Sequence, residues 1–73
     1  PLYWYRLWRM RRDVKFIEVA NLRIETLAMK IARLNNQRNG EEDPALERMI
    51  EVYQDKIIKL ESDIRDTVEK YRE

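Results

Sequence analysis

Apolar residues recur at alternating intervals of three and four along two stretches of the chain, residues 13–38 and 44–72. This spacing places them on one face of an α-helix and is typical of helices that pack side by side. The pattern predicts an all-α fold with two helices, each carrying an apolar seam. The predicted hairpin core takes six side chains from each seam: Ile17, Ala20, Ile24, Leu27, Ile31 and Leu34 from the first, and Leu46, Ile50, Tyr53, Ile57, Leu60 and Ile64 from the second.

Residues 39–43 separate the two stretches and carry the signals of a tight turn. Gly40 can adopt the left-handed backbone conformation that follows many helix ends. Asp43 and Pro44 are typical of a helix start, because an aspartate side chain accepts a free backbone N–H and proline fits the first helical position. The two predicted helices therefore run antiparallel, as a hairpin.

The predicted organisation is a single domain: an N-terminal segment over 1–12 continuous with the first helix over 13–38, a loop over 39–43, and a second helix over 44–72. Pairing the seams outward from the loop gives apolar layers as far as Ile17 and Ile64. Beyond them Asp13 faces Thr67, so we expect the packing to weaken at the end of the hairpin far from the loop, here called the open end. We also expect residues 2–8 to extend past the second helix.

The first helix carries a second apolar stripe on the side opposite its seam. At about 100° per residue, Val19, Leu22 and Met29 lie on this side, whereas the outer side of the second helix is mostly charged. A helix that is apolar on two sides is usually buried on both, and a chain of 73 residues forms only a marginal core. We therefore expect these three residues to mediate self-association, with hairpins dimerising into a four-helix bundle in which the first helix is inside.

Composition argues against catalysis. The chain has no cysteine and no histidine, which excludes disulfides, the usual zinc ligands and the commonest general base. Neighbouring carboxylates such as Asp63 and Asp66 fit a solvated helix surface, and no phosphate-binding glycine loop is present. We expect no enzyme activity, no cofactor, no metal site and no small-molecule substrate.

Charge is distributed unevenly along the chain. Residues 1–15 carry five basic residues and one acidic residue, a net charge of +4, whereas residues 16–73 carry ten basic and thirteen acidic residues, a net charge of −3. The N-terminal segment also holds both tryptophans. We name residues 1–12 the basic aromatic segment, and predict that it contacts a partner through Trp4, Trp8, Arg9, Arg11 and Arg12.

Three interpretations fit this segment. The first is structural, with or without an additional protein partner: Trp4, Trp8, Leu7 and Met10 pack across the dimer, while Arg9 and Arg12 reach Glu69 and Glu73 near the end of the second helix. A membrane surface is the second, because tryptophan and arginine favour the headgroup layer of anionic bilayers. Nucleic acid is the third and weakest, because five basic residues in front of an acidic body make a small electrostatic footprint.

The predicted function is that of a self-associating adaptor or regulatory protein. Its size and predicted shape resemble those of small phage and plasmid regulatory hairpins that dimerise into four-helix bundles. Cytoplasmic localisation is expected, with any membrane association through the N-terminus. One alternative is a domain of a membrane protein, either a cytosolic juxtamembrane coiled coil, in which a membrane span would precede residue 1, or a membrane-surface-binding domain. The other alternative is a small nucleic-acid-binding regulator.

Overall fold

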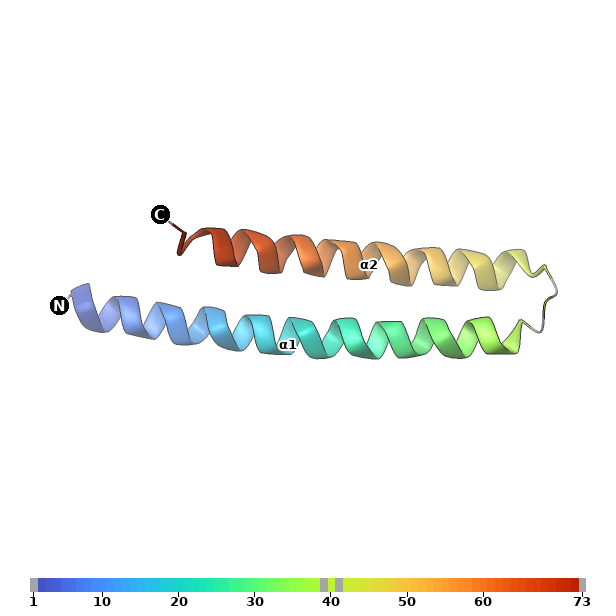
Figure 1. Ribbon diagram of the computed structural model, residues 1–73, viewed down its shortest axis with the longest axis horizontal. Helices are drawn as coiled ribbons and strands as arrows, with labels where there is room; N and C mark the ends of the chain where they lie inside the picture. Colours follow the sequence, from blue (N-terminus) through green and yellow to red (C-terminus); the bar gives the residue numbers. More distant parts are fainter. Residues whose placement is uncertain (1, 39, 41, 73) are drawn as a thin grey trace.

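A computed structural model describes residues 2–38, 40 and 42–72. Two helices make up the fold, α1 (Leu2–Gln37) and α2 (Pro44–Glu69), and they pack side by side in opposite directions (Figure 1). The chain forms a rod of 60 × 18 × 15 Å. The predicted all-α helical hairpin is confirmed.

α1 is one unbroken helix of 36 residues. No glycine or proline interrupts it, so the basic aromatic segment and the seam belong to the same rigid element. Gly40 follows shortly after its end, with a φ of +78°. In this left-handed region a side chain is strained, although no heavy atom lies within 4 Å of the place that a Cβ would take.

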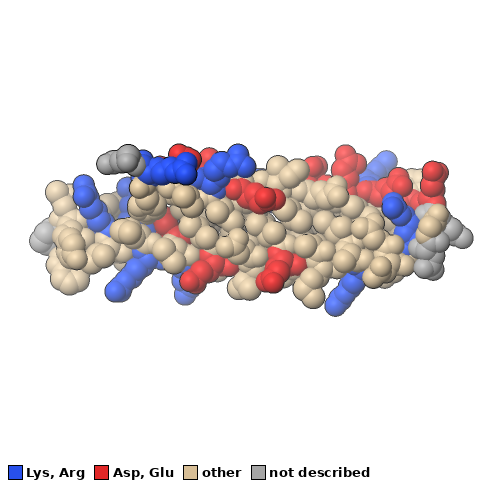
Figure 2. Space-filling view, in the orientation of Figure 1, with Lys and Arg blue, Asp and Glu red and all other residues tan. Residues whose placement is uncertain are grey.

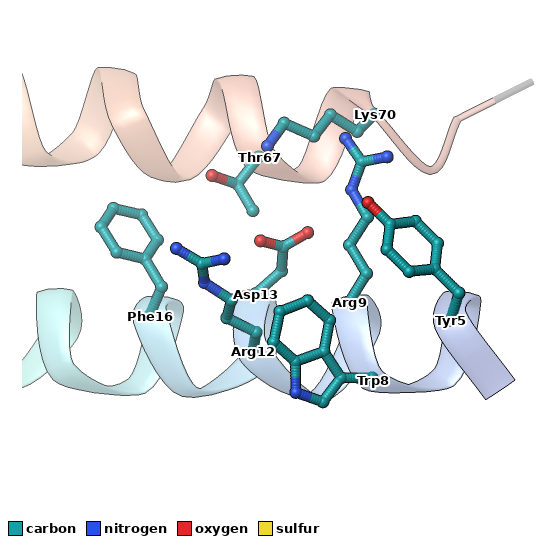
Figure 3. A pocket seen from close by; sticks show the side chains of 8 residues that line it. All are labelled: Tyr5, Trp8, Arg9, Arg12, Asp13, Phe16, Thr67 and Lys70. Atoms are coloured by element: carbon teal, nitrogen blue, oxygen red, sulfur yellow. The ribbon is translucent and has the colours of Figure 1, made fainter.

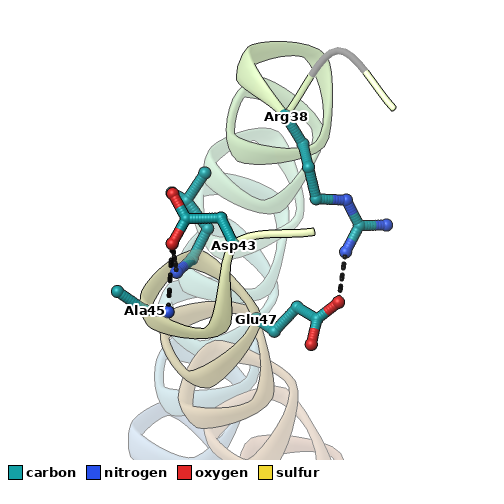
Figure 4. A network of polar contacts seen from close by, with 5 residues as sticks. Arg38, Asp43, Ala45 and Glu47 are labelled. Atoms are coloured by element: carbon teal, nitrogen blue, oxygen red, sulfur yellow. Dashed lines mark hydrogen bonds and ion pairs between the residues drawn. The ribbon is translucent and has the colours of Figure 1, made fainter. Parts of the chain in front are cut away.

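α2 starts at a well-formed cap (Figure 4). The Asp43 backbone is extended, and its carboxylate accepts hydrogen bonds from the backbone N–H groups of Ala45 at 3.1 Å and Leu46 at 3.3 Å. Arg38, just after α1, forms an ion pair of 3.2 Å with Glu47 in the first turn of α2. The turn is therefore fastened at both of its ends, which sets where α2 begins relative to α1.

The predicted second helix runs to residue 72, but regular α-helix ends at Glu69. Tyr71 and Arg72 instead donate backbone hydrogen bonds to the carbonyl groups of Val68 and Glu69, three residues back. Such tight turns are common where a helix finishes, because the last carbonyl groups have no partner further along the chain.

The predicted seam residues are the least exposed part of each helix. Ala20 and Ile50 are buried, at 2% and 8% exposure, and the remaining predicted core side chains are half-buried. A two-helix hairpin covers each seam from one side only, so half-burial is the geometric limit for most of these side chains.

The packing does not weaken at Thr67 as expected, since Thr67 is only 7% exposed. Its hydroxyl donates to the backbone carbonyl of Asp63 at 2.8 Å, which satisfies the polar group inside its own helix and leaves the methyl group to pack. At the next seam position, four residues after Thr67, the Tyr71 hydroxyl donates to the Asp13 carboxylate across the helix pair. Polar residues thus link the two helices at the open end instead of loosening it.

Tyr53 is the one aromatic ring in the middle of the seam. The ammonium groups of Lys30 and Lys56 lie 5.8 Å and 6.0 Å from its ring centroid. Both distances fall within the range of cation–π attraction. One of these lysines comes from each helix, so the Lys30 contact adds an interhelical interaction to the apolar seam.

Candidate interaction surface at the open end

The basic aromatic segment lies at the free end of α1, which extends beyond the last turn of α2 (Figure 1). Its aromatic side chains are mostly in solvent: Trp4 is 67% exposed and Trp8 is 57% exposed. Large apolar side chains at this exposure usually mark a surface for binding rather than a folded core.

The rings of the segment are organised in pairs along the helix. Tyr3 and Trp4 meet edge to face with centroids 6.1 Å apart, and the tilted rings of Tyr5 and Trp8 lie 6.2 Å apart. Tyr5 and Trp8 are three residues apart and so share one side of α1. The segment therefore displays two exposed aromatic pairs instead of four isolated rings.

Arginine side chains accompany these rings. The Arg12 guanidinium lies 5.6 Å from the centroid of the Trp8 ring, which is a cation–π contact. In the described residues of the single chain, neither Arg9 nor Arg12 pairs with Glu69, which instead pairs with Arg72, just beyond the end of α2, at 3.3 Å. The other expected acceptor, Glu73, lies outside the described residues.

A groove of about 510 Å³ runs between the two helices at the open end (Figure 3). Figure 3 shows Arg9 and Asp13 pointing from α1 toward α2, with the Lys70 side chain reaching back along α2 toward Thr67. Its lining combines three aromatic rings, three cations, one carboxylate and one hydroxyl: Tyr5, Trp8, Phe16, Arg9, Arg12, Lys70, Asp13 and Thr67. The groove is therefore positively charged overall, with apolar walls.

Among the described residues that line this groove, Asp13 is the only acidic one, and it is already engaged. Because its carboxylate accepts the hydrogen bond from Tyr71, the pKa of the Tyr71 hydroxyl is raised above its ordinary value; desolvation and the negative charge of Asp13 act in the same direction, while Arg9 opposes them. Within the described part of the chain, none of the ion pairs uses Arg9, Arg12 or Lys70; those present are Arg38–Glu47, Lys59–Asp63 and Arg72–Glu69. These three cations are available to an incoming acidic group.

The residues predicted to mediate self-association lie on the outer side of α1. Leu22 is 62% exposed, Met29 59% and Val19 44%. None of these three residues lines the open-end groove, so the structure separates the two predicted surfaces. Trp8 is shared between them: it lines the groove and lies on the same side of α1 as Leu22 and Met29. Arg11 lines a second, apolar hollow beside Leu7 and Val14.

The prediction that α2 would be mostly polar outside its seam is only partly right. Met49, Val52, Ile58 and Val68 are between 45% and 63% exposed. Ala45, Met49 and Val52 line a shallow apolar hollow of about 410 Å³. Sequence reasoning missed Met49 and Val68 because they flank the seam, where an apolar residue is hard to tell from a core residue. Their three- and four-residue spacing from seam positions was the signal that could have found them.

Neither described helix has a stretch long and apolar enough to cross a bilayer. In residues 2–38, 40 and 42–72, acidic side chains do not gather in a group that could hold a metal ion. Comparison with protein-family models, with curated proteins and with solved structures gives no significant match for this chain.

Proposed function

We propose that this chain is a non-catalytic interaction module that self-associates through the outer side of α1 and presents its basic aromatic segment to a partner protein. The observation that supports this most directly is the exposure of Trp4 and Trp8, which a continuous helix holds beyond the end of α2. Aromatic side chains and arginine are the residues that contribute most to protein–protein binding, and here they occur together.

Self-association rests on the second apolar stripe. Leu22 and Met29 are more exposed than most of the chain's other large aliphatic side chains, and they lie on a helix that already packs through its other side. A two-helix hairpin of this size buries little apolar surface by itself. Covering the stripe with a second copy would add the missing burial, and the predicted four-helix assembly belongs to this proposal.

Sedimentation equilibrium tests the self-association. Leu22→Glu combined with Met29→Glu should give a monomer, because two carboxylates would have to be buried against the second copy. Ile58→Glu is the matched control, since Ile58 is 63% exposed on the outside of α2 and the same type of change is made there. An unchanged mass for the Leu22 and Met29 variant, or an equal effect of Ile58→Glu, would refute this surface.

Photo-crosslinking in the source cell tests the partner contact. A benzoylphenylalanine placed at Trp4 should crosslink one protein, and the same group at Ile58 should not. Replacing Arg9, Arg11 and Arg12 by glutamine should abolish the band from position 4 without changing the helix content. Equal crosslinking from both positions would contradict a specific role for the basic aromatic segment.

A membrane surface is the second candidate partner, favoured by one observation. No acidic residue occurs between residues 2 and 12, so the exposed tryptophans are accompanied by positive charge alone. This composition suits the headgroup layer of an anionic bilayer. Both tryptophans lie in the segment, so their emission reports only on it. Vesicles with phosphatidylserine should shift this emission to shorter wavelength in a salt-sensitive way; no shift at low salt would eliminate the membrane.

A further inference from the structure

We infer that two copies of this chain pair antiparallel along the outer side of α1. The basic aromatic segment of each copy then lies against the acidic stretch of the other, residues 41–47 at the turn and the start of α2. The inference rests on the proposed self-association and specifies its direction and register. It also commits the exposed stripe of α1 to one occupant, which is a second copy of this chain.

The stripe itself defines the contact line. Residues 15, 22, 29 and 36 recur every seven positions and therefore follow one line along α1. If the twofold axis passes between residues 25 and 26, Leu22 of one copy faces Met29 of the other, and the same contact is made twice. In this register the aliphatic part of Arg33 covers Val19, and Lys15 faces Asn36. Both strongly exposed apolar residues of the line are then covered.

Charge favours the antiparallel direction. The chain is +4 over residues 1–15, whereas residues 41–47 contain four acidic residues and no basic one. Acidic side chains gather at the loop end of α2 on the face shown in Figure 2. A parallel pair would place Lys15 against Lys15 and two +4 segments side by side, which repel each other. An antiparallel pair separates these segments and brings each beside the opposite charge.

One unpaired cation on the outer side of α1 fits this arrangement. Arg11 lines the hollow beside Leu7 and Val14, away from the groove, and takes no part in the ion pairs of the described residues. In the proposed register Arg11 of one copy lies near the turn of the other, where Glu42 is exposed in the single chain and would be its acceptor. A contact that a single hairpin leaves unmade is thus supplied by the dimer.

The arrangement has a functional consequence. Residues 2–7 would extend past the turn of the other copy, so each end of the dimer would carry one aromatic surface. At about 1.5 Å per residue the two N-terminal ends are ~70 Å apart. Such a dimer would bridge two partners, or two places on one surface, whereas a parallel dimer would present both segments together at one end.

Disulfide trapping tests direction and register together, and the natural chain has no cysteine to interfere. Single variants Leu22→Cys and Met29→Cys are oxidised separately and as an equimolar mixture, with Ile58→Cys as an equally exposed control on α2. Facing helices bring opposed Cα atoms into the disulfide range of about 4.4–6.8 Å. Both sites are exposed, so the variants should fold, and circular dichroism verifies this.

The expected result is a covalent dimer from the mixture, several-fold more abundant than from either variant alone, and none from Ile58→Cys. Dimers from Leu22→Cys alone and Met29→Cys alone would show a parallel pair and overturn the inference, while leaving self-association intact. A dimer in sedimentation without any disulfide would overturn the surface. A monomer in sedimentation at all concentrations would overturn the inference together with the proposed self-association, yet not the partner contact of the basic aromatic segment.

Two further measurements are independent of disulfide chemistry. Spin labels at Val14→Cys should be separated by about 35 Å in the antiparallel register, against about 10 Å in a parallel pair. Glu25 approaches its own copy near the proposed axis, so Glu25→Gln should tighten the dimer by about twofold by removing a like-charge pair. A short label distance, or a weaker dimer with Glu25→Gln, would contradict the register.

Discussion

Shortening two isoleucines of α2 that differ mainly in burial tests whether the seam holds the hairpin together. Ile50 is 8% exposed and faces α1, whereas Ile58 is 63% exposed on the outer side of the same helix. Each change to alanine removes the same three side-chain carbon atoms, with their hydrogens, from a residue in the middle of a helix. The difference between the variants therefore reports on packing and not on side-chain type.

The magnitude follows from the exposed fractions. Burial contributes about 0.8 kcal/mol per carbon group, which gives about 2.2 kcal/mol for Ile50 and about 0.9 kcal/mol for Ile58. Alanine has the higher helix propensity by roughly 0.4 kcal/mol, a gain common to both variants. Part of the space left at Ile50 stays empty and adds to its cost. Ile50→Ala should thus lower the free energy of unfolding by about 2 kcal/mol, and Ile58→Ala by about 0.5 kcal/mol.

Urea unfolding followed by circular dichroism at 222 nm measures both values. At a slope of about 1 kcal/mol per molar urea, the midpoint should fall by about 2 M for Ile50→Ala and by about 0.5 M for Ile58→Ala. All samples need the same protein concentration, because association raises the apparent stability. Equal midpoints for the two variants, or a larger loss at Ile58, would refute the assignment of Ile50 to the seam.

Three further predictions concern the turn and the open end. Asp43→Ala should lower the free energy of unfolding by about 1 kcal/mol, whereas Asp43→Asn should retain most of the stability, because the asparagine side-chain oxygen can accept hydrogen bonds from the same backbone N–H groups. Equal urea midpoints for the two variants would count against the cap. Gly40→Ala should cost about 1 kcal/mol through its left-handed backbone, and D-alanine inserted by chemical synthesis should cost nothing; a matching loss with D-alanine would point to crowding instead of strain. The neutral Tyr71 hydroxyl is favoured in the folded state, so its bond to Asp13 should stabilise the hairpin below the ordinary tyrosine pKa of about 10 and be lost as the pH rises through the raised folded value. Thermal unfolding of wild type and Tyr71→Phe from pH 8 to 12 should therefore converge at high pH, and a constant difference would refute the pH dependence.

The fold could be predicted from the sequence because each signal acts locally. The seam spacing, Gly40, Asp43 and Pro44 each determine the conformation of their own residues, and together they leave the hairpin as the simplest arrangement. The end of α2 was harder to place, since nothing in residues 70–72 opposes a helix. There the outcome depends on the balance between the last helical turn and short-range hydrogen bonds.

The open-end site could be predicted only in part. The composition of residues 1–12 identified which side chains are available, but not how they are arranged. That Asp13 would be engaged by Tyr71, and that Lys70 would join Arg9 at one groove, depends on the axial stagger of two helices. The same holds for Thr67, whose polarity suggested a loose end until its hydroxyl was found bonded within α2. Long-range stagger is set by the turn, and a shift of one residue would have separated these groups.

The continuity of α1 also fixes a rotational phase. Because Leu2–Gln37 form one helix without a break, the bearing of each N-terminal ring about the helix axis is tied to the bearing of the seam some twenty residues away. Adding one residue between them would turn every ring by about 100°, whereas adding seven would return it almost to its original bearing. A partner that binds the N-terminal rings therefore also fixes the rotation of the hairpin about the axis of α1.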